Sequence, residues 1–127
     1  MKNLYFLSFF LLASLLISCG DDEPTTQTVS WELNGQNFDE QRTINSGDNT
    51  TINLLLESTS LCASHGVRVV VTANGAEQLN EFIISFNTNL EITVPENIDI
   101  GISTSLEDSN PQILCITLGS VDCTLTY

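Results

Sequence analysis

Apolar and polar residues alternate with a period of two along most of the chain after residue 28, which is the pattern of β-strands with one buried face. The apolar positions that share a face are Val29, Trp31 and Leu33; Ile52, Leu54 and Leu56; Val67, Val69, Val71 and Ala73; Phe82, Ile84 and Phe86; Leu90, Ile92 and Val94; and Ile98, Ile100 and Ile102. Two further segments, 113–118 and 121–127, meet at Gly119-Ser120. The pattern predicts about eight short strands.

Turn residues separate these segments. Asn34-Gly35 predicts a two-residue hairpin turn, with residues 36–38 returning from it, and Asn74-Gly75 predicts another turn. No useful window has a 3.6-residue apolar period, and residues 75–80, a weak helix candidate, are expected to form a loop. Short strands at this spacing predict an all-β fold: a single antiparallel β-sandwich, immunoglobulin-like in architecture.

Trp31 does not fit the cysteine spacing of true immunoglobulin domains, in which the buried tryptophan lies between two disulfide cysteines. Here Trp31 precedes Cys62, Cys115 and Cys123. The likeness is therefore one of architecture, and Trp31 is expected in the core.

The first residues have the layout of a secretory signal. Lys2 precedes an apolar run from Leu4 to Ile17, and the small residue Ser18 follows this run. The run is shorter than the roughly 20 residues of a membrane-spanning helix. It therefore predicts a signal that is cleaved rather than a permanent span.

The segment Leu16-Ile17-Ser18-Cys19 resembles the lipobox of bacterial lipoproteins. This resemblance implies that residues 1–18 are removed and that Cys19 is lipidated and becomes the N-terminus. Each buried CH₂ of an acyl chain contributes about 0.8 kcal/mol, so the two or three chains implied would hold the protein at a membrane. The alternative is an ordinary signal with an incidental cysteine.

Asp21, Asp22 and Glu23 resemble the surface-export signal of Bacteroidota lipoproteins. The resemblance implies an outer-membrane protein that faces the cell exterior, whereas a simple acidic linker would leave a periplasm-facing anchor. Residues 20–28 contain no aliphatic side chain, which predicts a flexible tether over 19–28 and a folded domain over 29–127.

The chain is strongly acidic, with sixteen acidic residues, three basic residues and a net charge of −13. Arg42 and Arg68 are the only arginines or lysines after the signal. Such a surface repels phosphates and anionic headgroups, which excludes nucleic acid as a partner. Serine, threonine and asparagine are abundant, and polar uncharged strands of this kind are compatible with sugar binding.

Three cysteines remain once Cys19 is assigned to lipid, and an oxidising exterior favours one disulfide and one free thiol. Cys123 alternates with Val121 and Leu125, which predicts a buried thiol. Cys115 has the opposite parity, so Cys62 and Cys115 are expected to pair. This expectation assumes that Gly119-Ser120 is a two-residue turn, and a three-residue turn would instead place Cys115 opposite Cys123.

Candidate chemistry is sparse. His65 is the single histidine, expected in a loop, and no Gly-x-Ser-x-Gly motif is present. A zinc site from three cysteines and His65 lacks any Cys-x-x-Cys pair. Asp108, Asn110 and Asp48 lie in oxygen-rich turns and are weak calcium candidates, although ordinary turn chemistry is the simpler explanation. No catalytic residue, metal or cofactor is assigned.

These observations favour a lipid-anchored surface protein with a non-catalytic binding or structural role. Its expected partners are the membrane, through the N-terminal lipid, and an outer-membrane protein or a glycan. Two alternatives stay open: a small carboxylate-dependent hydrolase, which needs two facing carboxylates, and an inhibitor-like module that acts by loop insertion.

Overall fold

The computed structural model describes residues 24–58, 62, 64–85, 87–110 and 119–127. In these residues the chain forms eight strands and no helix. The strands are β1 (Thr28–Leu33), β2 (Asp39–Asn45), β3 (Thr51–Ser58), β4 (His65–Ala73), β5 (Ala76–Ile83), β6 (Thr88–Thr93), β7 (Asp99–Asp108) and β8 (Val121–Thr126). No helix able to span a membrane occurs in the described part of the chain.

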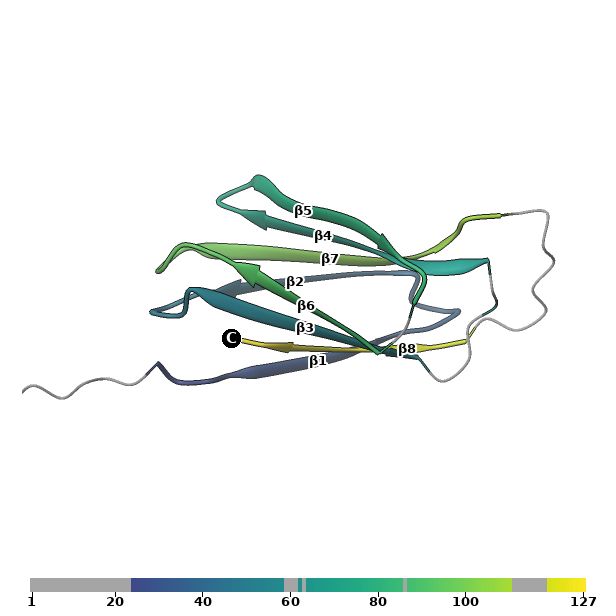
Figure 1. The fold of residues 1–127 in the computed structure, drawn as a ribbon, viewed down its shortest axis with the longest axis horizontal. Helices are drawn as coiled ribbons and strands as arrows, with labels where there is room; N and C mark the ends of the chain where they lie inside the picture. Colours follow the sequence, from purple (N-terminus) through teal and green to yellow (C-terminus); the bar gives the residue numbers. More distant parts are fainter. Residues whose placement is uncertain (1–23, 59–61, 63, 86, 111–118) are drawn as a thin grey trace, which may run out of the picture.

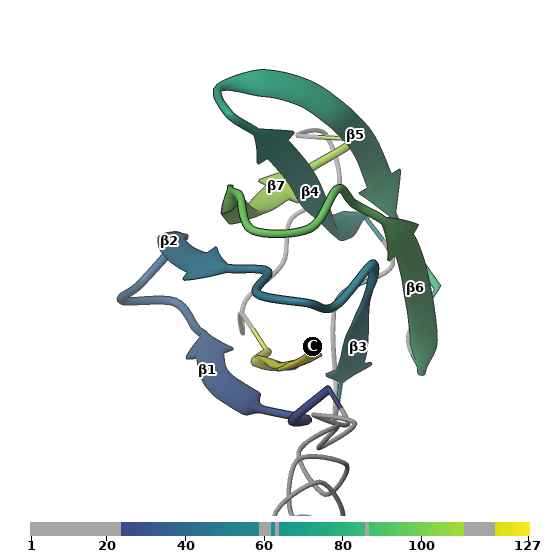
Figure 2. The ribbon, with the colours of Figure 1, turned by 90° about the vertical axis from the view of Figure 1, so that its left-hand side faces the viewer.

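The strands form two antiparallel four-stranded sheets, ordered β1-β8-β3-β6 and β2-β7-β4-β5, which pack face to face (Figures 1 and 2). The predicted all-β sandwich is therefore confirmed. β1 pairs with β8, β2 with β7, β3 with β6 and β4 with β5, so the chain is one long hairpin rolled into two sheets. This strand order is that of a jelly roll. The sequence had left the sheet topology open.

The core lies between the two sheets and is built from the alternating positions of nearly every strand. Its fully buried side chains include those at the predicted positions of β1, β3 and β4. They are Leu33, Ile52, Leu54, Leu56, Val67, Val69, Val71, Ile100, Val121, Cys123 and Leu125. Trp31 is 8% exposed, as expected for a core residue. The period-two pattern thus follows from burial of one face of each sheet.

The two Asn-Gly dipeptides behave differently. Asn74 (φ 50°) and Gly75 (φ 77°) form the predicted hairpin turn between β4 and β5. The hairpin predicted at Asn34-Gly35 is wrong, because β1 and β2 belong to opposite sheets. There the Asn34 side chain accepts hydrogen bonds from the backbone of Gln36 and Asn37, which stabilises a corner between the sheets.

Three strand predictions need correction. The return strand expected at 36–38 is instead β2, which starts at Asp39 and carries mostly polar residues. Residues 75–80 are not a loop, because β5 begins at Ala76. The strand predicted around Ile98–Ile102 is β7, which begins at Asp99 and continues to Asp108.

The apolar face predicted from Phe82, Ile84 and Phe86 is also wrong. The pairing of β4 with β5 shifts register between Val71 and Thr72, which changes the parity of β5. As a result Ile83 is buried and Ile84 is 63% exposed. Phe86 and the strand predicted at 113–118 lie outside the described residues.

Both ends of the described chain lie at one end of the sandwich, called here the tether end (Figure 1). Gln27 and Tyr127 exchange two backbone hydrogen bonds of 2.7 and 3.0 Å. The loops 46–50 and 94–98 lie at the same end, where Val94 bonds to Thr50 and Asn97 to Gly47. The tether therefore leaves the domain beside its C-terminus.

Candidate functional site

The site candidate is a hollow on the outer face of the β2-β7-β4-β5 sheet. It has a volume of about 200 Å³. Its lining residues are Gln41, Arg42, Thr43, Val70, Thr72, Gly101, Ile102 and Ser103. They come from β2, β7 and β4, which lie side by side in the sheet. The sheet register, rather than a loop, therefore builds the hollow.

Gly101, which has no side chain, lines the hollow from β7, the strand between β2 and β4. Its neighbours across the sheet are Thr43 on β2 and Thr72 on β4. A Cβ atom on Gly101 would lie 2.7 Å from Oγ1 of Thr72. Any larger residue would therefore displace Thr72 and fill the hollow, so glycine is what keeps the face recessed here.

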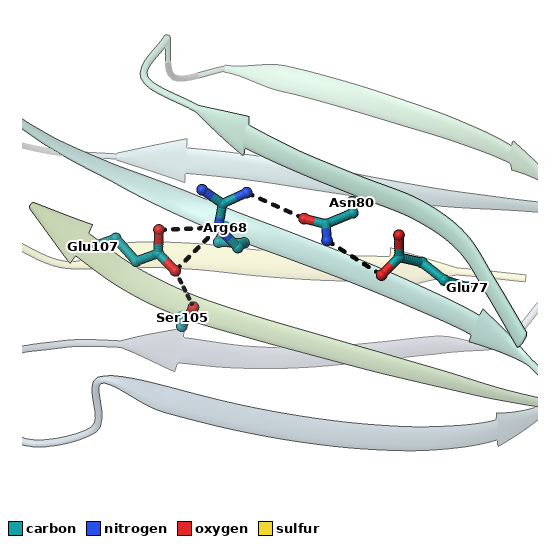
Figure 3. A network of polar contacts seen from close by, with 5 residues as sticks. All are labelled: Arg68, Glu77, Asn80, Ser105 and Glu107. Atoms are coloured by element: carbon teal, nitrogen blue, oxygen red, sulfur yellow. Dashed lines mark hydrogen bonds and ion pairs between the residues drawn. The ribbon is translucent and has the colours of Figure 1, made fainter. Parts of the chain in front are cut away.

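A fixed arginine lies on the same face, because Arg68 is two residues before the lining residue Val70 on β4. Figure 3 shows the contacts that hold Arg68. The Nε atom of Arg68 donates to both carboxylate oxygens of Glu107, at 3.1 and 3.0 Å. Its Nη1 atom donates to Asn80 at 3.1 Å, and Asn80 donates in turn to Glu77 at 3.2 Å. The Arg68 side chain is 38% exposed. The guanidinium is thus held in place on the surface with its charge paired.

Phe82 on β5 lies beside Arg68 on the outer face, as its direct cross-strand neighbour. The Arg68 guanidinium lies 5.4 Å from the centroid of its ring, which is within cation–π range. A Cβ atom on Gly66 would lie 2.6 Å from the ring, so the phenyl group covers the backbone of Gly66. Phe82 is therefore a partly exposed aromatic residue on the outer face, not a core residue.

Arg42 is also paired. Its guanidinium binds Glu40 at 3.0 Å and lies 5.7 Å from the ring centroid of Trp31 in the opposite sheet. Its buried Nε atom has no hydrogen-bond partner in the described part of the chain. Both described arginines thus have a carboxylate partner and an aromatic partner.

The outer face of the other sheet is acidic. Asp122 on β8 lies directly between Glu32 on β1 and Glu57 on β3 in the register. All three side chains are exposed. Within the described residues, no group of three histidine, cysteine or acidic side chains has the geometry to hold a metal ion. These three residues, called here the acidic row, make this face of the domain negatively charged.

A second cavity, of about 390 Å³, lies at the tether end. Its lining residues are Pro24, Thr25, Gln27, Asn45, Ser46, Gly47, Asp48, Asn49, Asn97 and Tyr127. Most are polar, and the Tyr127 hydroxyl donates to the Gln27 side chain at 3.0 Å. Because the tether forms part of its wall, this cavity also depends on the tether's position.

The calcium candidates lie in two separate turns, Asp108 with Asn110 in one and Asp48 in the other. Oδ1 of Asp108 accepts a 2.9 Å hydrogen bond from the backbone of Asn110, and Oδ1 of Asp48 accepts one of 3.4 Å from Asn97. Asp48 follows the end of β2 and Asp108 ends β7, and these antiparallel neighbours place them at opposite ends of the sheet. Asp108 thus has the hydrogen bond of an ordinary turn, and Asp48 has one to a neighbouring loop, while calcium binding at either turn stays a prediction.

His65 is not in a loop. It is the first residue of β4, pairs with Asp108 of β7 and is 9% exposed. Its Nδ1 atom lies 3.3 Å from the Ser64 hydroxyl. The histidine lies at the start of an inner strand and is absent from the linings of the hollow and of the second cavity.

Cys123 is the buried free thiol that parity predicted. Burial, and to a lesser degree the charge of Asp122, raises the pKa of the Cys123 thiol to about 12. The alternative Cys115–Cys123 pairing is therefore excluded. Cys62 is disulfide-bonded, but Cys115 lies outside the described residues, as do Cys19, Asp21, Asp22 and Glu23. The Cys62–Cys115 pairing stays a prediction.

No protein-family model matches the chain, and a search of curated proteins finds no match either.

Sequence reasoning missed the hollow and the Arg68 cluster. Gln41 and Thr43 lie on a strand that the pattern did not predict, and Glu107 lies on an unpredicted extension of β7. The available signal was the run of small polar residues after Ile100, which continues the alternation as Gly101, Ser103 and Ser105.

Proposed function

We propose that this protein is a lipid-anchored domain of the outer-membrane surface with a non-catalytic binding role, exerted by the outer face of the β2-β7-β4-β5 sheet. The observation that carries the binding role is the hollow at Gly101, built by three adjacent strands and bordered by the fixed Arg68. A rigid sheet keeps polar side chains at set spacings, and such pre-organisation lowers the cost of binding.

The tether supports this arrangement. Gln27 follows Cys19 by only eight positions, so the anchor can lie at most about 30 Å from the domain. The long axis of the sandwich extends away from the tether end (Figure 1), so a lipid at Cys19 would leave the outer face open to solvent on the side of the domain. That position suits a ligand in the medium or a neighbouring surface protein.

The anchor is tested by fractionation. Cys19→Ala should leave the membrane fraction or accumulate as the uncleaved precursor, and unchanged fractionation would contradict the lipid anchor. Replacing Asp21, Asp22 and Glu23 with alanine should protect the domain from protease added to whole cells. Unchanged cleavage would show that this cluster is only a linker.

The binding role is tested by photo-crosslinking on intact cells. A photoreactive residue at Thr43 should form adducts, whereas one at Thr124, on the outer face of the other sheet, should not. Equal yields at both positions, or none at Thr43, would contradict a role for this face. The mass and chemistry of the adduct identify the partner.

A carboxylate-dependent hydrolase is the second candidate, favoured by the row of Glu32, Asp122 and Glu57. None of the three lines either cavity, and Asp48 is the single carboxylate among the lining residues of the two. These positions support binding over hydrolysis. Release of new reducing ends from a bound glycan, abolished by Asp122→Asn, would favour the enzyme. The inhibitor-like alternative has no supporting observation in the described residues.

A further inference from the structure

We infer that the hollow at Gly101 binds a sugar unit of a neutral glycan. This inference rests on the proposed binding role of the outer face and adds the chemical class of the ligand. Charge supplies the first argument. Arg42 is the single charged residue among the lining residues, and Glu40 pairs with it at 3.0 Å. The hollow itself is therefore close to neutral.

The surrounding charge excludes other classes of ligand. The net charge of −13 opposes the approach of a polyanion, and both arginines of the domain already have carboxylate partners. A cationic ligand would be drawn to the row of Glu32, Asp122 and Glu57 on the opposite face. An uncharged, polar ligand fits the hollow best.

The available hydrogen-bonding groups match hydroxyls. Gln41, Thr43 and Ser103 each present a donor and an acceptor, and none makes a side-chain hydrogen bond to another described residue. Gln41 and Ser103 are direct cross-strand neighbours, and Thr43 lies beside Gly101. Several uncharged groups that can both donate and accept are what a ligand rich in hydroxyls requires.

Size and apolar contact agree with one sugar ring. The volume of about 200 Å³ is below the range of roughly 300–1,000 Å³ for drug-sized ligands. Val70, the neighbour of Ser103 on β4, adds an apolar surface that can contact the C–H groups of a ring. The face continues past Ser105 to Arg68 and Phe82, so further units of a chain would find polar and aromatic contacts.

The experiment is affinity electrophoresis of the full chain purified from membranes in detergent. The native gels contain a neutral polysaccharide (starch, mannan, xylan or mixed-linkage β-glucan) or an anionic one (alginate or polygalacturonate). We expect retardation in at least one neutral gel and none in the anionic gels. Ser103→Leu, which fills the hollow, should weaken that binding at least tenfold.

Matched variants separate binding from folding. Ser30→Leu makes the same change on the outer face of the other sheet and should bind as wild type does. Thr43→Val removes a hydroxyl and should weaken binding, while Thr43→Ser keeps the hydroxyl and should retain it. Equal melting temperatures for Thr43→Val and Thr43→Ser confirm that the difference lies in the site.

Two results would overturn the inference: retardation in no neutral gel, or retardation that Ser103→Leu leaves unchanged. Retardation in anionic gels alone is a case of the first result. Failure of the glycan inference can be distinguished from failure of the proposed function. A protein adduct at the Thr43 photo-crosslinker would support the binding role and contradict the glycan ligand. Absence of any adduct at Thr43 would instead reject the binding role.

Discussion

The indole Nε1 of Trp31 in β1 donates a hydrogen bond of 2.9 Å to Oγ1 of Thr104 in β7, and so joins the two sheets through the core. Trp31 is 8% exposed and Thr104 is fully buried. Neither polar group has access to water as a substitute partner. The bond therefore satisfies a buried donor and fixes the position of β1 relative to the second sheet.

Removing the acceptor should destabilise the domain. Thr104→Val keeps the shape but leaves the indole N–H unpaired, which costs about 1–3 kcal/mol. The loss in the free energy of unfolding is measured by denaturant titration, with the fluorescence of Trp31, the single tryptophan, as the signal. In a Trp31→Phe background, followed by circular dichroism, Thr104→Val should cost much less. An equal cost in both backgrounds would show that the bond does not contribute.

Stability should fall at high pH because of Cys123. Its thiol has a pKa raised from 9.0 to about 12, so the folded state holds a proton that the unfolded state releases above pH 9. The stabilising effect is present below pH 9 and is lost as the pH rises to about 12. The loss is about 2 kcal/mol at pH 10.5. Unfolding between pH 8 and 10.5 should show it in wild type and not in Cys123→Ser.

The acidic row should oppose folding. Like charges directly opposite each other in a sheet are destabilising, so Asp122→Asn should raise the free energy of unfolding by about 0.2–1 kcal/mol. The gain should shrink in high salt, because salt screens exposed charges. Glu91→Gln is the control, since Glu91 faces Asn53 rather than a carboxylate. A gain in Glu91→Gln as large as in Asp122→Asn would reject the row as the cause.

The two Asn-Gly dipeptides should respond differently to the same substitution. Gly75 has a φ of 77°, and a Cβ atom added to it would meet no other atom within 4 Å, so Gly75→Ala should cost about 1–2 kcal/mol from backbone strain alone. Gly35 is not at positive φ, and Gly35→Ala should cost clearly less. Thermal unfolding of both variants tests this. Equal losses would contradict the different turn geometries.

The disulfide prediction concerns Cys62 and Cys115. Non-reducing peptide mapping should join these two cysteines, while Cys123 reacts with alkylating reagents only after denaturation. Cys62→Ser and Cys115→Ser should each cost about 2–4 kcal/mol, chiefly because the open chain has more unfolded conformations. The double variant should cost little more than either single one. Cys62 mapped to another cysteine would contradict the pairing.

The sequence by itself determined the fold class and most of the core. Trp31, Leu54, Val69 and Cys123 were assigned to buried faces because a strand turns alternate side chains to opposite sides, and this local rule holds whatever its partners. The hairpin turn at Asn74-Gly75 could also be predicted from the sequence, since the type of turn depends on the two residues within it.

Only the tertiary structure decided which strands became neighbours. β1 and β2 are separated by a short corner, yet pair with β8 and β7, and the bulge in β5 turns Phe82 outward to meet Arg68. The hollow at Gly101 and the Arg68–Glu107 pair arise from cross-strand register between residues far apart in the chain. Alternation along one strand carries no information on its neighbours, because register is set by how the two sheets bury their apolar faces together.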